Sequence, residues 1–161
     1  MSTALKAQFD FQTRLFNNVT NGISDSESHV RKTEHTNHIK WIAGHMLNTR
    51  LGTMSKLAGL QPDDSYGAQF GRGATLDPNA TYPSLEEITT KWEAVSPAIA
   101  EGLSNIPAEV LASKAPFETP ITNLDDTIQG VLSFLLTHEA CHIGQLSILR
   151  KMVGKEAMSF R

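Results

Sequence analysis

The sequence has almost no cysteine and no long apolar run. Its single cysteine, Cys141, cannot form a disulfide within the chain, which agrees with a reducing compartment. No stretch reaches the roughly 18 apolar residues of a membrane span. The first 21 residues lack the apolar core of a secretory signal. We therefore expect a cytoplasmic protein that folds without disulfides.

An excess of positive charge is also missing. The chain has 14 Lys and Arg against 17 Asp and Glu, a formal net charge of −3. Without a dense basic run, it has no surface suited to displacing counterions from nucleic acid, which is therefore not an expected partner. An apolar fraction of 40% with 19% charged residues is typical of a globular protein. The 161 residues are expected to form a single domain, 1–161.

What the sequence does have is helical periodicity, and it has no convincing period-two alternation of the kind that marks β-strands. Apolar residues recur at steps of three and four in four long stretches. These are residues 4–21, 34–57, 85–103 and 128–153. Gly22, Gly59 and Gly154 stand where helices commonly end. The pattern predicts an all-α helix bundle, in which inward-facing side chains can converge on a metal.

The connections between these stretches differ in character. Residues 24–32 form a polar connection, and 60–83 are rich in Gly, Pro, Asp and Asn, which predicts a long loop of the kind that often covers a site. Residues 106–123 contain three prolines and predict a connection with one short helical turn around 108–111.

The ends of two helices carry polar signals of their own. The run Ser84-Leu85-Glu86-Glu87 predicts a capping box, in which the Ser84 hydroxyl and the Glu87 carboxylate satisfy free N–H groups. Asp125 and Asp126 are expected to complement the N-terminus of the last helix.

His138 and His142 are four residues apart in the last helix, so their side chains project about 40° apart and can reach one ion. Neutral imidazoles suit zinc, nickel, copper or iron(II), and not magnesium or calcium. The third ligand we predict is His45, which shares an inward stripe with Trp41 and Ile42. An unpaired polar ring there would cost roughly 1–3 kcal/mol, and a metal would supply the partner.

The competing interpretation is that each histidine is a hydrogen-bonded core residue or a surface residue. Three histidines on two apolar helix faces favour a metal site over that interpretation. The remaining histidines have different expected roles. His38 could hydrogen-bond a metal ligand, but a packing or helix-capping role is favoured, and His29 and His35 are expected to be solvated.

Residues 138–142 also spell H-E-x-x-H, in which Glu139 would be the general base of a metalloprotease. The longer form of that motif is absent, because Gln145 and Ile148 occupy its Gly and His positions. Glu139 therefore fits a structural or ligand-orienting role better. Cys141 is expected to be a small packing residue, and Gln145 either hydrogen-bonds a ligand or packs.

Two segments carry a family resemblance. Residues 37–45, N-H-I-K-W-I-A-G-H, and residues 137–146, T-H-E-A-C-H-I-G-Q-L, followed by Leu149-Arg150-Lys151, resemble the two histidine motifs of the DinB/YfiT-like superfamily. The resemblance implies an up-down-down-up four-helix bundle, often a homodimer. It also implies one nickel or zinc ion per chain, held by His45, His138 and His142.

The resemblance does not specify a reaction. Some members of that superfamily are thiol-dependent transferases or isomerases that use small thiols such as bacillithiol or mycothiol. Three neutral ligands leave the charge of the ion uncompensated, which favours ionised thiol or water at an open position. We therefore expect a metal-dependent enzyme acting on a small molecule, with thiol-dependent transfer ahead of hydrolysis. The alternative is a protein that binds a metal or small molecule without catalysis.

Overall fold

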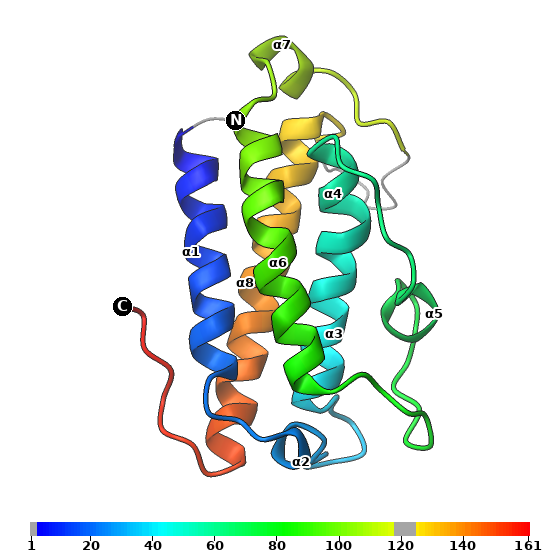
Figure 1. Cartoon of the computed structure of the whole chain (residues 1–161), viewed down its shortest axis with the longest axis vertical. Helices are drawn as coiled ribbons and strands as arrows, with labels where there is room; N and C mark the ends of the chain where they lie inside the picture. The colour runs from blue at the N-terminus through cyan, green and yellow to red at the C-terminus, as the bar shows by residue number, and fades with distance from the viewer. Residues whose placement is uncertain (1–2, 118–124) are drawn as a thin grey trace.

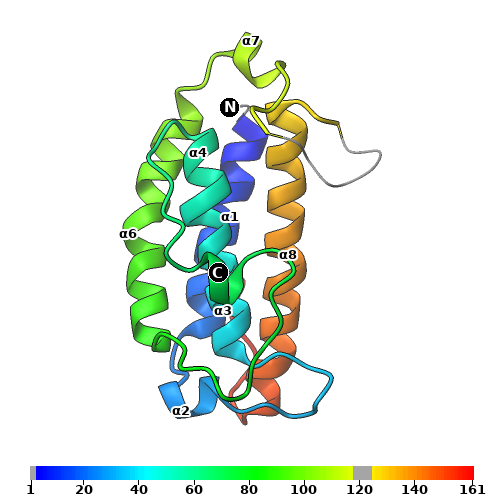
Figure 2. The ribbon, with the colours of Figure 1, turned by 90° about the vertical axis from the view of Figure 1, so that its right-hand side faces the viewer.

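The computed structural model describes residues 3–117 and 125–161, and within these ranges four long helices pack as a bundle (Figure 1). They are α1 (Thr3–Thr20), α3 (Ile39–Thr49), α6 (Leu85–Ser104) and α8 (Ile128–Met152). In Figures 1 and 2, α1 and α8 run in one direction and α3 and α6 in the other. The predicted all-α, up-down-down-up architecture is confirmed.

Helix α3 continues past its end without a break in the chain direction. It passes through one π-helical stretch, η1 (Arg50–Met54), into α4 (Ser55–Leu57). The mark of this stretch is the backbone N–H of Ser55, which donates to the carbonyl of Arg50 five residues earlier. The sequence predicted the end of this composite helix, at Leu57, but not the π-helical insertion.

The core consists of two apolar clusters along the bundle axis. One contains Phe16 and Trp92, whose rings stack with centroids 4.0 Å apart. The other contains Phe9, Met54 and Leu132 among its buried side chains. The Arg50 guanidinium lies over the Trp92 ring at 3.5 Å and over the Phe9 ring at 4.3 Å. A buried cation therefore sits where the two clusters meet.

The start of α3 differs from the prediction. The predicted helix 34–57 begins five residues late, at Ile39, because His38 has extended backbone angles and acts as the N-cap. Its Nδ1 accepts a hydrogen bond from the Trp41 backbone N–H at 2.9 Å. The predicted packing or capping role of His38 is confirmed. The helix ends were predicted better, since Gly22, Gly59 and Gly154 all adopt positive φ.

The predicted capping box at Ser84 is half correct. The Ser84 hydroxyl accepts from the Glu87 N–H at 3.0 Å, but the Glu87 carboxylate instead accepts from the Tyr66 hydroxyl. A complete capping box occurs elsewhere, between Ser24 and Glu27 at the start of α2 (Asp25–Ser28). That short helix lies in the segment that the sequence predicted as a plain connection.

The connection before α8 follows the prediction more closely. Its helical turn is α7 (Ala108–Leu111), as predicted, and residues 118–124 of the predicted connection lie outside the described residues. Helix α8 is capped by Thr127, whose hydroxyl accepts from the Gly130 N–H at 3.0 Å. Asp125 and Asp126 directly precede that cap, at the helix N-terminus as expected, and Asp125 accepts from the backbone N–H of Thr127 at 3.0 Å.

The long loop predicted at 60–83 contains one helical turn, α5 (Gly67–Phe70), which packs against α3. Both views show α5 beside α3, outside the bundle (Figures 1 and 2). Phe70 is fully buried there. In the described part of the chain, no helix combines the length and apolarity needed to cross a bilayer.

The cap at His38 predicts a pH dependence of stability. Burial lowers the pKa of His38 from 6.5 to about 4, with smaller contributions from His29 and Lys40. The unfolded chain therefore binds this proton more tightly, so His38 stabilises the fold fully above about pH 6.5 and progressively less as the pH falls toward 4. Urea unfolding at pH 7 and pH 5 measures the loss.

The variant His38→Asn provides the control, because asparagine caps helices but does not titrate. We expect its unfolding midpoint to fall less between pH 7 and pH 5 than that of the native chain. The other histidines are common to both proteins and cancel in the comparison. Equal losses in the two proteins would contradict this role of His38.

Candidate metal centre

The three predicted histidines meet between α3 and α8. His45 comes from α3, and His138 and His142 come from successive turns of α8. The Nε2 atom of His138 lies 3.0 Å from Nε2 of His45 and 3.0 Å from Nε2 of His142. The rings are steeply inclined, with interplanar angles of 60°, 77° and 82°. All three side chains thus direct their Nε2 atoms toward one point, although they are separated by up to 97 positions in sequence.

Two of the rings are oriented by hydrogen bonds on their far side. His45 Nδ1 donates to the carbonyl oxygen of Phe70 at 2.6 Å, and His142 Nδ1 donates to Oε1 of Gln145 at 2.8 Å. Since both oxygens are acceptors, the hydrogen of each ring is on Nδ1 and the lone pair is on Nε2. This is how proteins hold histidines that bind metals.

The electrostatics favour the neutral form of two of the rings, His138 and His142. Burial, reinforced by His142 and His45, lowers the pKa of His138 to about 4. Burial also lowers the pKa of His142, against the opposing effect of the Gln145 hydrogen bond. Neutral imidazole is the form that binds metal ions. The cluster is therefore ready to accept a cation near neutral pH.

The donor set fits a transition metal. Around a tetrahedral ion with metal–nitrogen bonds of about 2.05 Å, ligand nitrogens lie about 3.3 Å apart, close to the 3.0 Å seen here. The Nε2 lone pairs of His45 and His142 point toward the same place. Only a cation or a shared proton there relieves the repulsion between them. In residues 3–117 and 125–161, these histidines are the one group of three or more potential ligands close enough to hold a metal.

Aromatic side chains surround the cluster on the α3 side. The Trp41 ring stacks on His45 with a centroid distance of 5.4 Å and an interplanar angle of 7°. Gly44 allows the Phe70 ring to press against α3, because a Cβ at this position would overlap that ring. The three histidines are only half-buried, so an ion held here would remain accessible from solvent.

Glu139 cannot be the general base of a metalloprotease. Its Oε1 accepts from Arg50 Nε at 2.7 Å and its Oε2 accepts from Arg50 Nη2 at 2.9 Å. Both side chains are fully buried, and Arg50 also donates to Thr13 and Ser96. Since both oxygens of Glu139 are held by the guanidinium, the H-E-x-x-H string has no protease role. The predicted structural role is confirmed.

The neighbouring predictions had mixed outcomes. Gln145 hydrogen-bonds a ligand, as one of its two predicted roles required. Cys141 is exposed, so its predicted packing role is wrong. His35 is exposed as predicted, and His29 is also exposed, although its ring lies 4.6 Å from that of His38.

Two residues of the site were not anticipated. Arg50 had a visible signal, a charged residue within an apolar helical stretch. Phe70 had none, because it acts through its backbone carbonyl, which every residue possesses.

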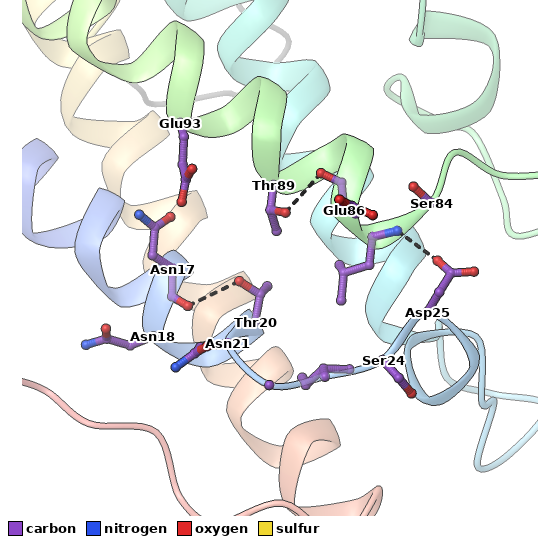
Figure 3. A pocket seen from close by; sticks show the side chains of 13 residues that line it. Asn17, Asn18, Thr20, Asn21, Ser24, Asp25, Ser84, Glu86, Thr89 and Glu93 are labelled. Atoms are coloured by element: carbon purple, nitrogen blue, oxygen red, sulfur yellow. Dashed lines mark hydrogen bonds between the residues drawn. The ribbon is translucent and has the colours of Figure 1, made fainter.

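A separate polar cavity of about 630 Å³ lies between the end of α1, α2 and the start of α6. Figure 3 shows Asn17 and Glu93 facing each other across it, and Asp25 accepting from the backbone N–H of Leu85. None of the three histidines lines this cavity. It is therefore distinct from the histidine cluster.

The fold and the cluster together define a helical bundle with a three-histidine site between two antiparallel helices. The family model described as the DinB superfamily matches residues 8–146, so this chain belongs to that superfamily. This confirms the resemblance seen in the two histidine motifs.

A solved structure supports the fold independently. The crystal structure of a conserved protein from Enterococcus faecalis is similar, with a TM-score of 0.66 and 15% identity over 95% of this chain and 98% of that chain. At this identity the likeness shows the fold alone. Among curated proteins, none matches the sequence at a significant level.

The contact between Gly44 and Phe70 predicts a sensitive position. Gly44→Ala should displace the Phe70 ring and weaken the hydrogen bond from His45, lowering metal affinity by roughly 10- to 100-fold. Competition with a metal chelator measures the affinity. Gly67→Ala, in α5, is the matched control, because a Cβ there meets nothing within 4 Å. Equal affinities for the two variants would show that Phe70 does not orient His45.

Proposed function

We propose that this chain holds one divalent ion, nickel or zinc, through the Nε2 atoms of His45, His138 and His142, and that it is a metal-dependent enzyme. The observation that carries the proposal is the pair of Nδ1 hydrogen bonds, to Phe70 and Gln145, which turn the lone pairs of His45 and His142 toward His138. Half-buried ligands support an ion with an open coordination position, and sealed structural sites lack one.

A bound divalent ion would act there as a Lewis acid, lowering the pKa of a thiol or a water molecule. The chain supplies neutral ligands, an aromatic wall from Trp41 and Phe70, and access from solvent. A thiol has an ordinary pKa of about 8.5 and water of about 15.7, so a thiol needs far less help to ionise. Both oxygens of Glu139 accept hydrogen bonds from Arg50, so this carboxylate does not face the ion. These features favour thiol-dependent group transfer over hydrolysis.

The proposed partner is accordingly a small-molecule substrate together with a low-molecular-weight thiol. The homodimer implied by the family resemblance stays a prediction, which light scattering of the purified protein would measure.

The ligand assignment predicts the metal content of variants. His45→Ala and His142→Ala should each lose stoichiometric metal, because two imidazoles bind a divalent ion far more weakly than three. Elemental analysis of the purified proteins measures the ratio of metal to chain. His35→Ala, which changes an exposed histidine, should keep the full content. Full retention in either ligand variant would reject that residue as a ligand.

The proposed chemistry predicts direct binding of a thiol at the ion. In protein loaded with cobalt(II), added thiols should produce a new near-ultraviolet charge-transfer band that saturates with concentration. The metal-free protein and the His142→Ala variant should show no such band. If the loaded protein responds to no thiol, the transferase proposal fails and hydrolysis becomes the better account of the same site.

A further inference from the structure

The three histidines of the cluster differ in what their Nδ1 atoms contact. His45 Nδ1 donates to the carbonyl of Phe70, and His142 Nδ1 donates to Oε1 of Gln145. His138 Nδ1 is buried from solvent and has no hydrogen-bond partner in the described part of the chain. His138 is therefore the one histidine of the three whose far nitrogen is not held by a hydrogen bond.

This difference determines where the hydrogen of the His138 ring lies. The Nε2 lone pairs of His45 and His142 face His138 Nε2, which lies 3.0 Å from each of these atoms. In protein without an ion, the hydrogen of His138 is therefore on Nε2, between two acceptors, and its Nδ1 keeps a lone pair. His138 then holds the three rings together as a hydrogen-bond donor.

Binding an ion requires a change at His138 alone. His45 and His142 carry their hydrogens on Nδ1, so their Nε2 lone pairs are free to bind. A neutral imidazole has one hydrogen for two nitrogens, so His138 can bind through Nε2 only after its hydrogen moves to Nδ1. The side chain of Phe134, whose ring centroid lies 6.1 Å from that of His138, offers no acceptor there. A buried donor without an acceptor costs free energy, which weakens the bond between His138 and the ion.

We infer that His138 has two roles: without an ion it donates the hydrogen bond that keeps the three rings together, and with an ion bound it is the most weakly held of the three ligands. The inference rests on the proposed function, since it concerns the same ion. Groups that hold the far nitrogen of a metal-binding histidine contribute roughly 10- to 100-fold to metal affinity. His45 and His142 have such a group and His138 has none, so the ion is held mainly by His45 and His142.

The first test measures the hydrogen positions in the unaltered chain. Nitrogen NMR of protein with isotope-labelled histidine distinguishes the two tautomers, because protonated and unprotonated ring nitrogens have different chemical shifts. In metal-free protein we expect the hydrogen on Nδ1 of His45 and His142 and on Nε2 of His138. Addition of zinc should move the hydrogen of His138 to Nδ1 and leave the other two rings unchanged. A hydrogen on Nδ1 of His138 before zinc is added would overturn the inference.

The second test compares the ligands by competition for zinc with a chelator. His138→Ala should lower the affinity less than His142→Ala does, by a factor of roughly 10 to 100. Gln145→Leu provides the matched background, because it removes the acceptor of His142 and leaves its ring in place. In that background, His142→Ala should cost no more affinity than His138→Ala costs in the native chain. Equal losses from the two alanine variants of the native chain would contradict the inference.

The outcomes separate this inference from the proposed function. A chain that binds no zinc overturns the proposed function, whatever tautomers the histidines adopt. A chain that binds zinc and depends equally on all three histidines keeps the proposed function and overturns the weaker hold on His138. Thermal unfolding shows whether each variant is folded, and the NMR test needs no substitution, so it decides the matter even if a variant fails to fold.

Discussion

The bidentate ion pair between Arg50 and Glu139 is the contact on which the arrangement of the bundle depends. It joins the composite α3 helix to α8 at the point where the two apolar clusters meet. Removing one member of a buried pair costs roughly 3–5 kcal/mol, because the other charge is left unpaired. A slip of one helical turn, about 5.4 Å, would break it completely. The pair therefore selects one register between the helices.

That register is what brings the histidines together. Glu139 directly follows His138, and Arg50 lies five residues after His45, so the same two helices carry the ion pair and the three histidines. Hydrophobic packing tolerates small shifts between helices, whereas a guanidinium bonded to both oxygens of a carboxylate does not. The core of the bundle thus determines the geometry of a site that lies nearer its surface, although the ion pair does not contact the ring nitrogens of the three histidines.

Much of this architecture could be predicted from the sequence, because helical periodicity is a local property. The helix ends at Gly22, Gly59 and Gly154 and the pairing of His138 with His142 followed from spacing, and His45 was placed beside them from the inward face that it shares with Trp41 and Ile42. Contacts over long sequence separations could not be predicted: the pairing of Arg50 with Glu139, and the bond from His45 to the carbonyl of Phe70. The late start of α3 was missed because His38 falls at helical spacing from Ile42 and His45, and a histidine is an uncommon cap.

The π-helical stretch at Arg50–Met54 lets the parts of the helix before and after it face in different directions than they would in a uniform helix. One additional residue in a helix rotates everything after it by roughly 100°. The segment before the insertion can therefore direct His45 toward α8, while the segment after it turns Leu57 into the second apolar cluster. Substitutions in the half of the helix that carries His45 need not disturb packing in the other half. The chemistry of the site can therefore change while the stability of the fold is preserved.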